Sequence, residues 1–162
     1  NQAFPRLLLP IAAVMVAIRR FVPTMVVYLI ISLALSRPFS FVQLLVIPSF
    51  ILLIIFGVGL AALFATMQVY FRDVASLLPY ISRIWLYVSP ILYYADQIPA
   101  AFAAAMPFNP LYGLMGIWTE TLSQGELPPA SLWINAVAWT VISICVGTYF
   151  FLRKEREFAV RL

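Results

Sequence analysis

The chain has 162 residues, of which 64% are hydrophobic and 10% are charged, and its formal net charge is +4. A soluble domain is about half apolar and about a quarter charged, so this chain cannot cover a globular surface with polar groups. The composition predicts a multi-span integral membrane protein, and the apolar segments taken in order below predict an all-α fold with about four transmembrane helices. In such a protein, basic residues mark the cytoplasmic side more often than a nucleic-acid site.

Several kinds of site are excluded by residue type. There is no histidine, and the single cysteine, Cys145, has no intramolecular partner, so a histidine base, a disulfide framework and a thiolate metal cluster are all excluded. No glycine precedes a Lys-Ser or Lys-Thr pair, so the chain lacks a phosphate-binding loop and does not hydrolyse ATP itself. Because the chain begins with Asn1 and has no signal-peptide pattern, we expect an N-terminal portion to precede it.

The beginning of the chain predicts an elbow helix followed by a span. The apolar run at 7–18 has 12 residues, bounded on both sides by arginine. At about 1.5 Å per residue, this run is too short to cross a hydrocarbon core about 30 Å thick. We therefore expect a cytoplasmic elbow helix at 1–20 and a span at 21–36.

Three more spans follow from the apolar pattern. A span at 41–67 leads into a charged elbow at 68–76, and a third span follows at 77–94. The last span, 132–152, runs into a basic tail at 153–162.

The segment 97–130 predicts a pair of short helices rather than a span. Prolines and glycines interrupt its uncharged part, and Asn109-Pro110 is a good helix start, with Asn capping and Pro in the first position. Two helices therefore meet at a turn formed by Pro107, Asn109 and Pro110. The first helix has about nine residues, so the pair would enter the membrane and return to the external side.

The basic residues support this re-entrant topology. It places eight of them on one side: Arg6, Arg19, Arg20, Arg72, Arg153, Lys154, Arg156 and Arg161. Only Arg37 lies on the other side. If residues 98–118 crossed the membrane, the basic tail would be translocated, against the positive-inside rule. We therefore expect a cytoplasmic C-terminus.

Five motifs in this order resemble a known family. They are "FPRLLLP" at 4–10, "VYFRDVASLL" at 69–78, "SPILYYADQIP" at 89–99, "NPLYGL" at 109–114 and the tail "FLRKEREFA". Together they resemble the permease subunits of type-2 ATP-binding-cassette exporters, in the branch that exports polysaccharide, O-antigen and teichoic acid. The resemblance implies a six-span protein of the bacterial cytoplasmic membrane, of which this chain holds the last four spans.

The resemblance also implies partners. A separate ATPase subunit would bind ATP and Mg, leaving this chain without a cofactor, and two permeases would assemble with two ATPases. The substrate would be a lipid-linked polysaccharide. Two elbows would contact the ATPase, the first through Phe4, Pro5 and Arg6, the second through Tyr70, Phe71, Arg72 and Asp73. The alternative for Arg72 and Asp73 is that they only end a helix at the lipid headgroups.

A set of aromatic and basic residues is the candidate substrate conduit. Sugar rings pack their CH faces on aromatic rings, and the candidates are Arg83, Trp85, Tyr87, Tyr93, Tyr94 and Trp118. The alternative for the outer aromatic residues is an interfacial belt. Arg83 either contacts a lipid-linked phosphate or reaches the headgroups as an anchor.

Two other functions stay open. One is a drug or small-lipid exporter of the same class. The other is a membrane-embedded enzyme that acts on polyprenyl-linked sugars, which needs clustered acids or basic residues at one membrane face. Only Asp73 and Asp96 come near this requirement, and they are predicted on opposite sides.

Overall fold

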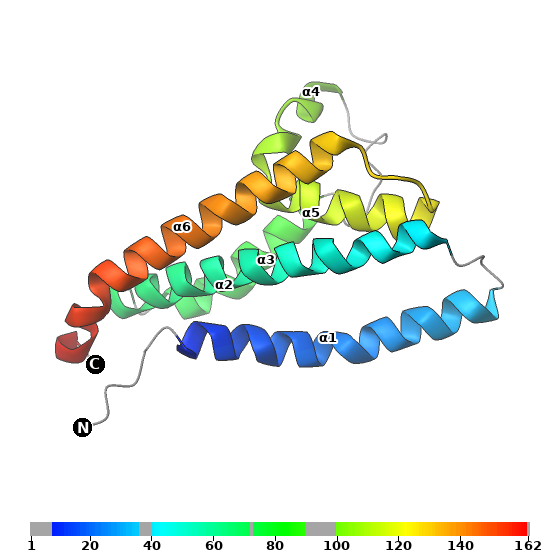
Figure 1. Ribbon diagram of the computed structural model, residues 1–162. Coiled ribbons are helices and arrows are strands. Elements are labelled where there is room, and N and C mark those ends of the chain that lie inside the picture. Colours follow the sequence, from blue (N-terminus) through cyan, green and yellow to red (C-terminus); the bar gives the residue numbers. More distant parts are fainter. Residues whose placement is uncertain (1–7, 36–39, 72, 90–99, 162) are drawn as a thin grey trace.

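The computed structural model describes residues 8–35, 40–71, 73–89 and 100–161, and all secondary structure in these ranges is helical. The long helices are α1 (Leu8–Ala34), α2 (Val46–Tyr70) and α6 (Ala130–Arg161). The shorter elements are α3 (Val74–Val88), α4 (Ala100–Ala103), α5 (Pro110–Trp118), 3₁₀ turns at Phe41–Leu45 and Met106–Phe108, and a π-helical segment at Thr119–Gln124. Figure 1 shows that α1 begins and α6 ends at the same end of the bundle.

Three stretches are long and apolar enough to cross a membrane. They are Leu8–Ala34, Phe41–Tyr70 and Ala130–Lys154. The second and third contain the spans predicted at 41–67 and 132–152. α6 does not end with its span, because the same helix continues through the basic tail to Arg161.

The N-terminal elbow helix and first span are a single helix. The predicted boundary near residue 20 was wrong, because α1 runs from Leu8 to Ala34 through Arg19 and Arg20. Arginine is a good helix former, so the charged pair does not interrupt the helix. Pro23 also lies inside α1, as is tolerated in membrane helices.

The third predicted span is shorter in the structure than the sequence indicates. α3 has 15 residues and ends at Val88, where Ser89 takes an extended conformation. Its length of about 22 Å is less than a hydrocarbon core of about 30 Å. Residues 90–94 of the predicted span lie outside the described residues, so the predicted number of four spans is not confirmed.

α2 and α6 pack side by side in parallel at a contact between small residues. A Cβ atom added to Gly147 would collide with the carbonyl of Gly59, and one added to Gly59 would collide with the backbone of Ser143. The Ser143 hydroxyl donates a 2.9 Å hydrogen bond to the Phe56 carbonyl. Glycines let membrane helices approach until their backbones touch, and the buried hydroxyl joins them.

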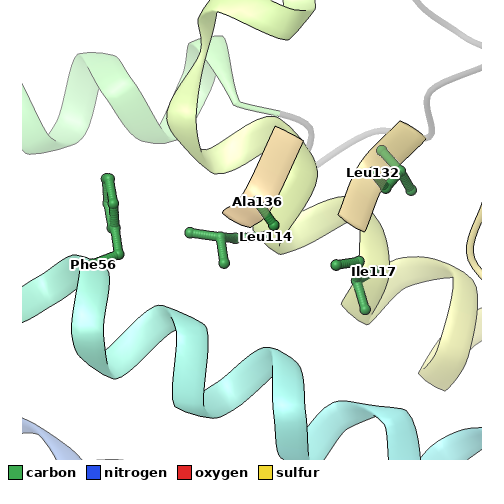
Figure 2. Close-up of a cluster of buried hydrophobic side chains, with 5 residues drawn as sticks. All are labelled: Phe56, Leu114, Ile117, Leu132 and Ala136. Carbon is green, nitrogen blue, oxygen red and sulfur yellow. The ribbon is translucent and has the colours of Figure 1, made fainter. Parts of the chain in front are cut away.

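A second contact brings α5 against α6. Figure 2 shows its apolar cluster, formed by Phe56 of α2, Leu114 and Ile117 of α5, and Leu132 and Ala136 of α6. Gly113 of α5 permits this approach, since an added Cβ would collide with the backbone of α6 at Leu132. The bundle core is thus built from α2, α5 and α6.

The segment predicted as re-entrant is only partly as expected. α4 has four residues instead of the predicted nine or so, and residues 97–99 lie outside the described residues. α5 begins where the Asn-Pro pair predicts: the Asn109 side chain accepts from the Leu111 amide, and Pro110 takes the first helical position. Figure 1 shows α5 alongside only part of α2. Whether the segment returns to the external side stays a prediction.

Candidate functional site

A stripe of polar and aromatic side chains runs along one face of α3. It consists of Asp73, Ser76, Tyr80, Arg83 and Tyr87, which recur every three or four residues. At about 100° per residue, this spacing places all five within about 80° of the helix circumference. We call these five residues the α3 stripe.

The α3 stripe is open to its surroundings. All five residues are exposed, and the two tyrosines expose 66% and 63% of their surface. Among the described residues, none of the five side chains has a hydrogen-bond or ion-pair partner. A tyrosine hydroxyl or a guanidinium facing lipid without a partner is costly, so this face is suited to water or a polar ligand.

The chemistry of the α3 stripe suits a carbohydrate. Tyrosine rings offer flat apolar surfaces for sugar CH faces, and their hydroxyls both donate and accept hydrogen bonds. Arg83 adds a forked donor for phosphate or carboxylate groups. Phosphate contact is one of the two roles predicted for Arg83. The residue lies about 14 Å along the helix axis from Val74, the first residue of α3.

Trp85 lies on the opposite face of α3. Its indole nitrogen donates a 2.9 Å hydrogen bond to the Asn109 side-chain oxygen, and its ring meets Phe56 edge-on at 6.3 Å between centroids. Tyr87 lies about 200° away around the helix. Trp85 and Tyr87 were both predicted as conduit residues, but the structure does not bring them together.

Trp85 instead lines an apolar cavity. The cavity has a volume of about 420 Å³ and lies between α1, α2, α3 and α5. Its walls include Ile18 and Phe21 of α1, Leu53 and Phe56 of α2, and one hydroxyl residue of α3, Ser82. Such a space suits a hydrocarbon chain, and among the described lining residues only Ser82 offers a side-chain hydroxyl.

Trp118 lies inside the bundle rather than beside the α3 stripe. Its ring packs edge-on against Phe21 and Phe50, at 5.6 and 6.1 Å between centroids. Its indole nitrogen is buried without a hydrogen-bond partner among the described residues. Tyr93 and Tyr94, the remaining conduit candidates, lie outside the described residues.

Two asparagines hold the turn at 107–110. The Asn109 side chain joins α3 to α5, since it also donates to the Ser89 hydroxyl at 3.0 Å and the Val88 carbonyl at 3.3 Å. Asn135 of α6 donates to the Pro107 carbonyl at 2.7 Å and accepts from the Gly113 amide at 3.1 Å. Asn135 therefore links α6 to the turn and to α5.

The start of the second elbow packs against α6 at Phe151 and Lys154. The Lys154 amine lies 5.4 Å from the centroid of the Tyr70 ring, and Phe151 is buried against Tyr70 and its α2 neighbours. Phe71 is 65% exposed and Asp73 is exposed, so both are accessible in this chain. The other elbow candidates, Phe4, Pro5, Arg6 and Arg72, lie outside the described residues. The coupling role of both elbows stays a prediction.

Two members of the α3 stripe were missed in the sequence. Tyr80 and Ser76 precede Arg83 by three and seven residues, the spacing of one helix face. Extending the face of Arg83 backwards along the predicted span would have identified both.

Comparison with known proteins finds relatives along almost the whole chain. The "O-antigen export system permease protein RfbA" of Klebsiella pneumoniae is 28% identical over 160 residues, covering 98% of this chain and 61% of that protein. The chain resembles O-antigen export permeases. A second K. pneumoniae protein of this name is 27% identical over 165 residues, and one from Myxococcus xanthus is 23% identical over 159 residues.

These export permeases confirm the resemblance drawn from the five motifs. The chain spans about three fifths of the length of each relative, at 61%. No protein-family model and no solved structure matches the chain.

Proposed function

We propose that this chain is part of the membrane subunit of an ATP-driven exporter, which moves a lipid-linked polysaccharide across the bacterial cytoplasmic membrane. The observation that carries the proposal is the similarity to O-antigen export permeases over 98% of the chain. A separate ATPase subunit supplies ATP hydrolysis and binds ATP and Mg. Two copies of the permease assemble with two ATPases, and the elbow at Tyr70–Asp73 contacts the ATPase.

The α3 stripe lines the path of the polysaccharide in this proposal. Its exposed tyrosines, Tyr80 and Tyr87, offer stacking surfaces at successive depths along one helix face. Stacking on ring faces tolerates different sugars, which suits a long glycan that must slide past the site. Trp85 and Trp118 pack inside the bundle and act as structural residues.

The test is export by cells whose own permease gene is deleted and replaced by the full-length gene of this protein. Tyr80→Ala and Tyr87→Ala together should lower surface polysaccharide about tenfold or more, since stacking on each ring is worth about 1 kcal/mol. Phe41→Ala is the matched control, because Phe41 is an 87% exposed aromatic residue outside the α3 stripe. Normal export by the double variant would remove the α3 stripe from the path.

Two other outcomes would indicate the alternative functions, a drug or small-lipid exporter and a membrane-embedded enzyme. If the full-length permease restores no surface polysaccharide but its absence sensitises cells to small amphipathic compounds, the protein is a drug or small-lipid exporter. If polyprenyl-linked sugars change in structure rather than location, the protein is an enzyme. Either result contradicts the proposal.

A further inference from the structure

Arg19 and Arg20 lie deep within α1. Because α1 is continuous from Leu8 to Ala34, the pair stands about 17 Å along the axis from Leu8 and about 22 Å from Ala34. A hydrocarbon core about 30 Å thick fits on this helix of about 40 Å only in positions that include both arginines. Wherever α1 crosses the membrane, the pair therefore lies inside the core, about 6 Å or more from its nearer edge, and not on the cytoplasmic side where the count of basic residues placed it.

The pair faces away from the bundle. Phe21 stacks on Phe50 of α2 at 5.2 Å between ring centroids, and the Val14 side chain reaches Gly57. These contacts define the inner face of α1. At about 100° per residue, Arg19 and Arg20 lie about 140° and 240° around the helix from Val14, on either side of the outer face. Both are exposed.

Neither arginine is neutralised within the described part of the chain, where they have no ion-pair or hydrogen-bond partner. A guanidinium does not lose its proton, so inside a membrane it needs a counter-charge that is present at all times. A passing substrate does not meet this need between transport cycles. A second α1 related by two-fold symmetry would bring four arginines together, so charge repulsion excludes that pairing.

We propose that the outer face of α1, defined by Val16, Arg19, Arg20, Pro23 and Val27, is an interface with another membrane-spanning helix of the same full-length protein, which carries an Asp or Glu at the depth of the arginines. Charge complementarity selects this occupant, because a forked guanidinium pairs closely with a carboxylate. The apolar neighbours of the pair supply the packing surface on either side. The inference requires only that α1 crosses the membrane, and it is independent of the exported substrate.

The experiment measures thermal unfolding of the full-length protein, purified in an uncharged maltoside detergent. With a resident acid, Arg19→Leu/Arg20→Leu should lower Tm by about 5 °C or more, because the carboxylate is left buried and unpaired. Arg19→Lys/Arg20→Lys retains the positive charge, so its Tm should fall by less than that of the double leucine variant. The control is Arg153→Leu, at an exposed arginine near the end of α6 whose guanidinium contacts Tyr149.

The pH dependence identifies the partner as an acid. Burial without a counter-ion raises the pKa of a carboxyl group above its value in the unfolded chain. Such a group favours the folded state at low pH and loses this contribution as the pH rises through the raised pKa. The leucine variant should therefore approach the wild-type Tm as the pH falls from about 8 to about 5.

Three results would overturn the proposal. If the leucine variant is as stable as the wild type or more stable, the outer face meets hydrocarbon. If its loss of stability does not depend on pH, the partner is not a carboxyl group. If the loss occurs only in nanodiscs containing phosphatidylglycerol and not in detergent, the counter-charge is a lipid phosphate. If the leucine variant does not fold, Arg20→Gln is measured in the same way.

Discussion

At the residue scale, side-chain amides and hydroxyls decide how the helices are joined. The cap formed by Asn109 could be predicted, because a helix start depends on neighbours in the sequence. Its bond to Trp85, 24 residues away, could not be predicted, since this contact depends on how α3 and α5 pack. Helical spacing alone separates Trp85 from Tyr87, but which of the two faces the bundle depends on the same packing.

Replacing Asn109 tests this link directly. Asn109→Ala removes the cap and the acceptor of the Trp85 indole, so we expect the free energy of unfolding to fall by about 2–4 kcal/mol. Asn109→Asp keeps the side-chain acceptor but loses the donor to the Ser89 hydroxyl and the Val88 carbonyl. Its free energy of unfolding should lie between those of the wild type and the alanine variant. Reversible unfolding in mixed detergent measures both. Equal stability of the alanine variant and the wild type would show that the turn is held without Asn109.

At the element scale, the sequence predicted apolar helices better than their ends. Helices long and apolar enough to cross a membrane cover the spans predicted at 41–67 and 132–152, because an apolar run of that length is visible in the sequence itself. The predicted boundary between two helices near Arg19 and Arg20 was wrong. A pair of charged residues does not end a helix, because arginine is a good helix former in the interior. The α2–α6 contact depends on two glycines 88 residues apart in the sequence, and no local pattern pairs them.

Two glycines of α2 give opposite predictions for one substitution. Gly59→Ala should destabilise the protein by about 1–3 kcal/mol, because its Cβ would collide with the Ser143 backbone. Gly57→Ala is the matched control in the same helix. Its Cβ would meet only a Val14 methyl carbon, at 3.9 Å, so we expect it to stabilise α2 by about 0.5–1 kcal/mol. Thermal unfolding of both variants in the same detergent compares them, and a stabilising Gly59→Ala would contradict the close α2–α6 contact.

At the scale of the whole molecule, the order of the helices determines which loops share a side of the membrane. The Tyr28 hydroxyl donates a 3.1 Å hydrogen bond to the Leu122 carbonyl, which places the end of the π-helical segment beside the second half of α1. The ring of Trp118 lies against Phe50, near the start of α2. These contacts support a topology in which residues 119–129 lie on the same side as the α1–α2 connection.

Cysteine labelling tests this topology. Single cysteines replace Phe41, Glu126 or Arg161 in a Cys145→Ser background, since Cys145 is itself exposed. We expect a membrane-impermeant maleimide to label Phe41→Cys and Glu126→Cys in intact cells, and Arg161→Cys only after the membrane is opened. Phe41→Cys is the internal reference, because the predicted orientation of α1 and α2 places it on the external side whether or not residues 98–118 cross the membrane. If residues 98–118 crossed it, α6 would be inverted, and Arg161→Cys would label in intact cells while Glu126→Cys would not. That inverted pattern would also place the basic tail outside, against the positive-inside rule, and would rule out the re-entrant topology.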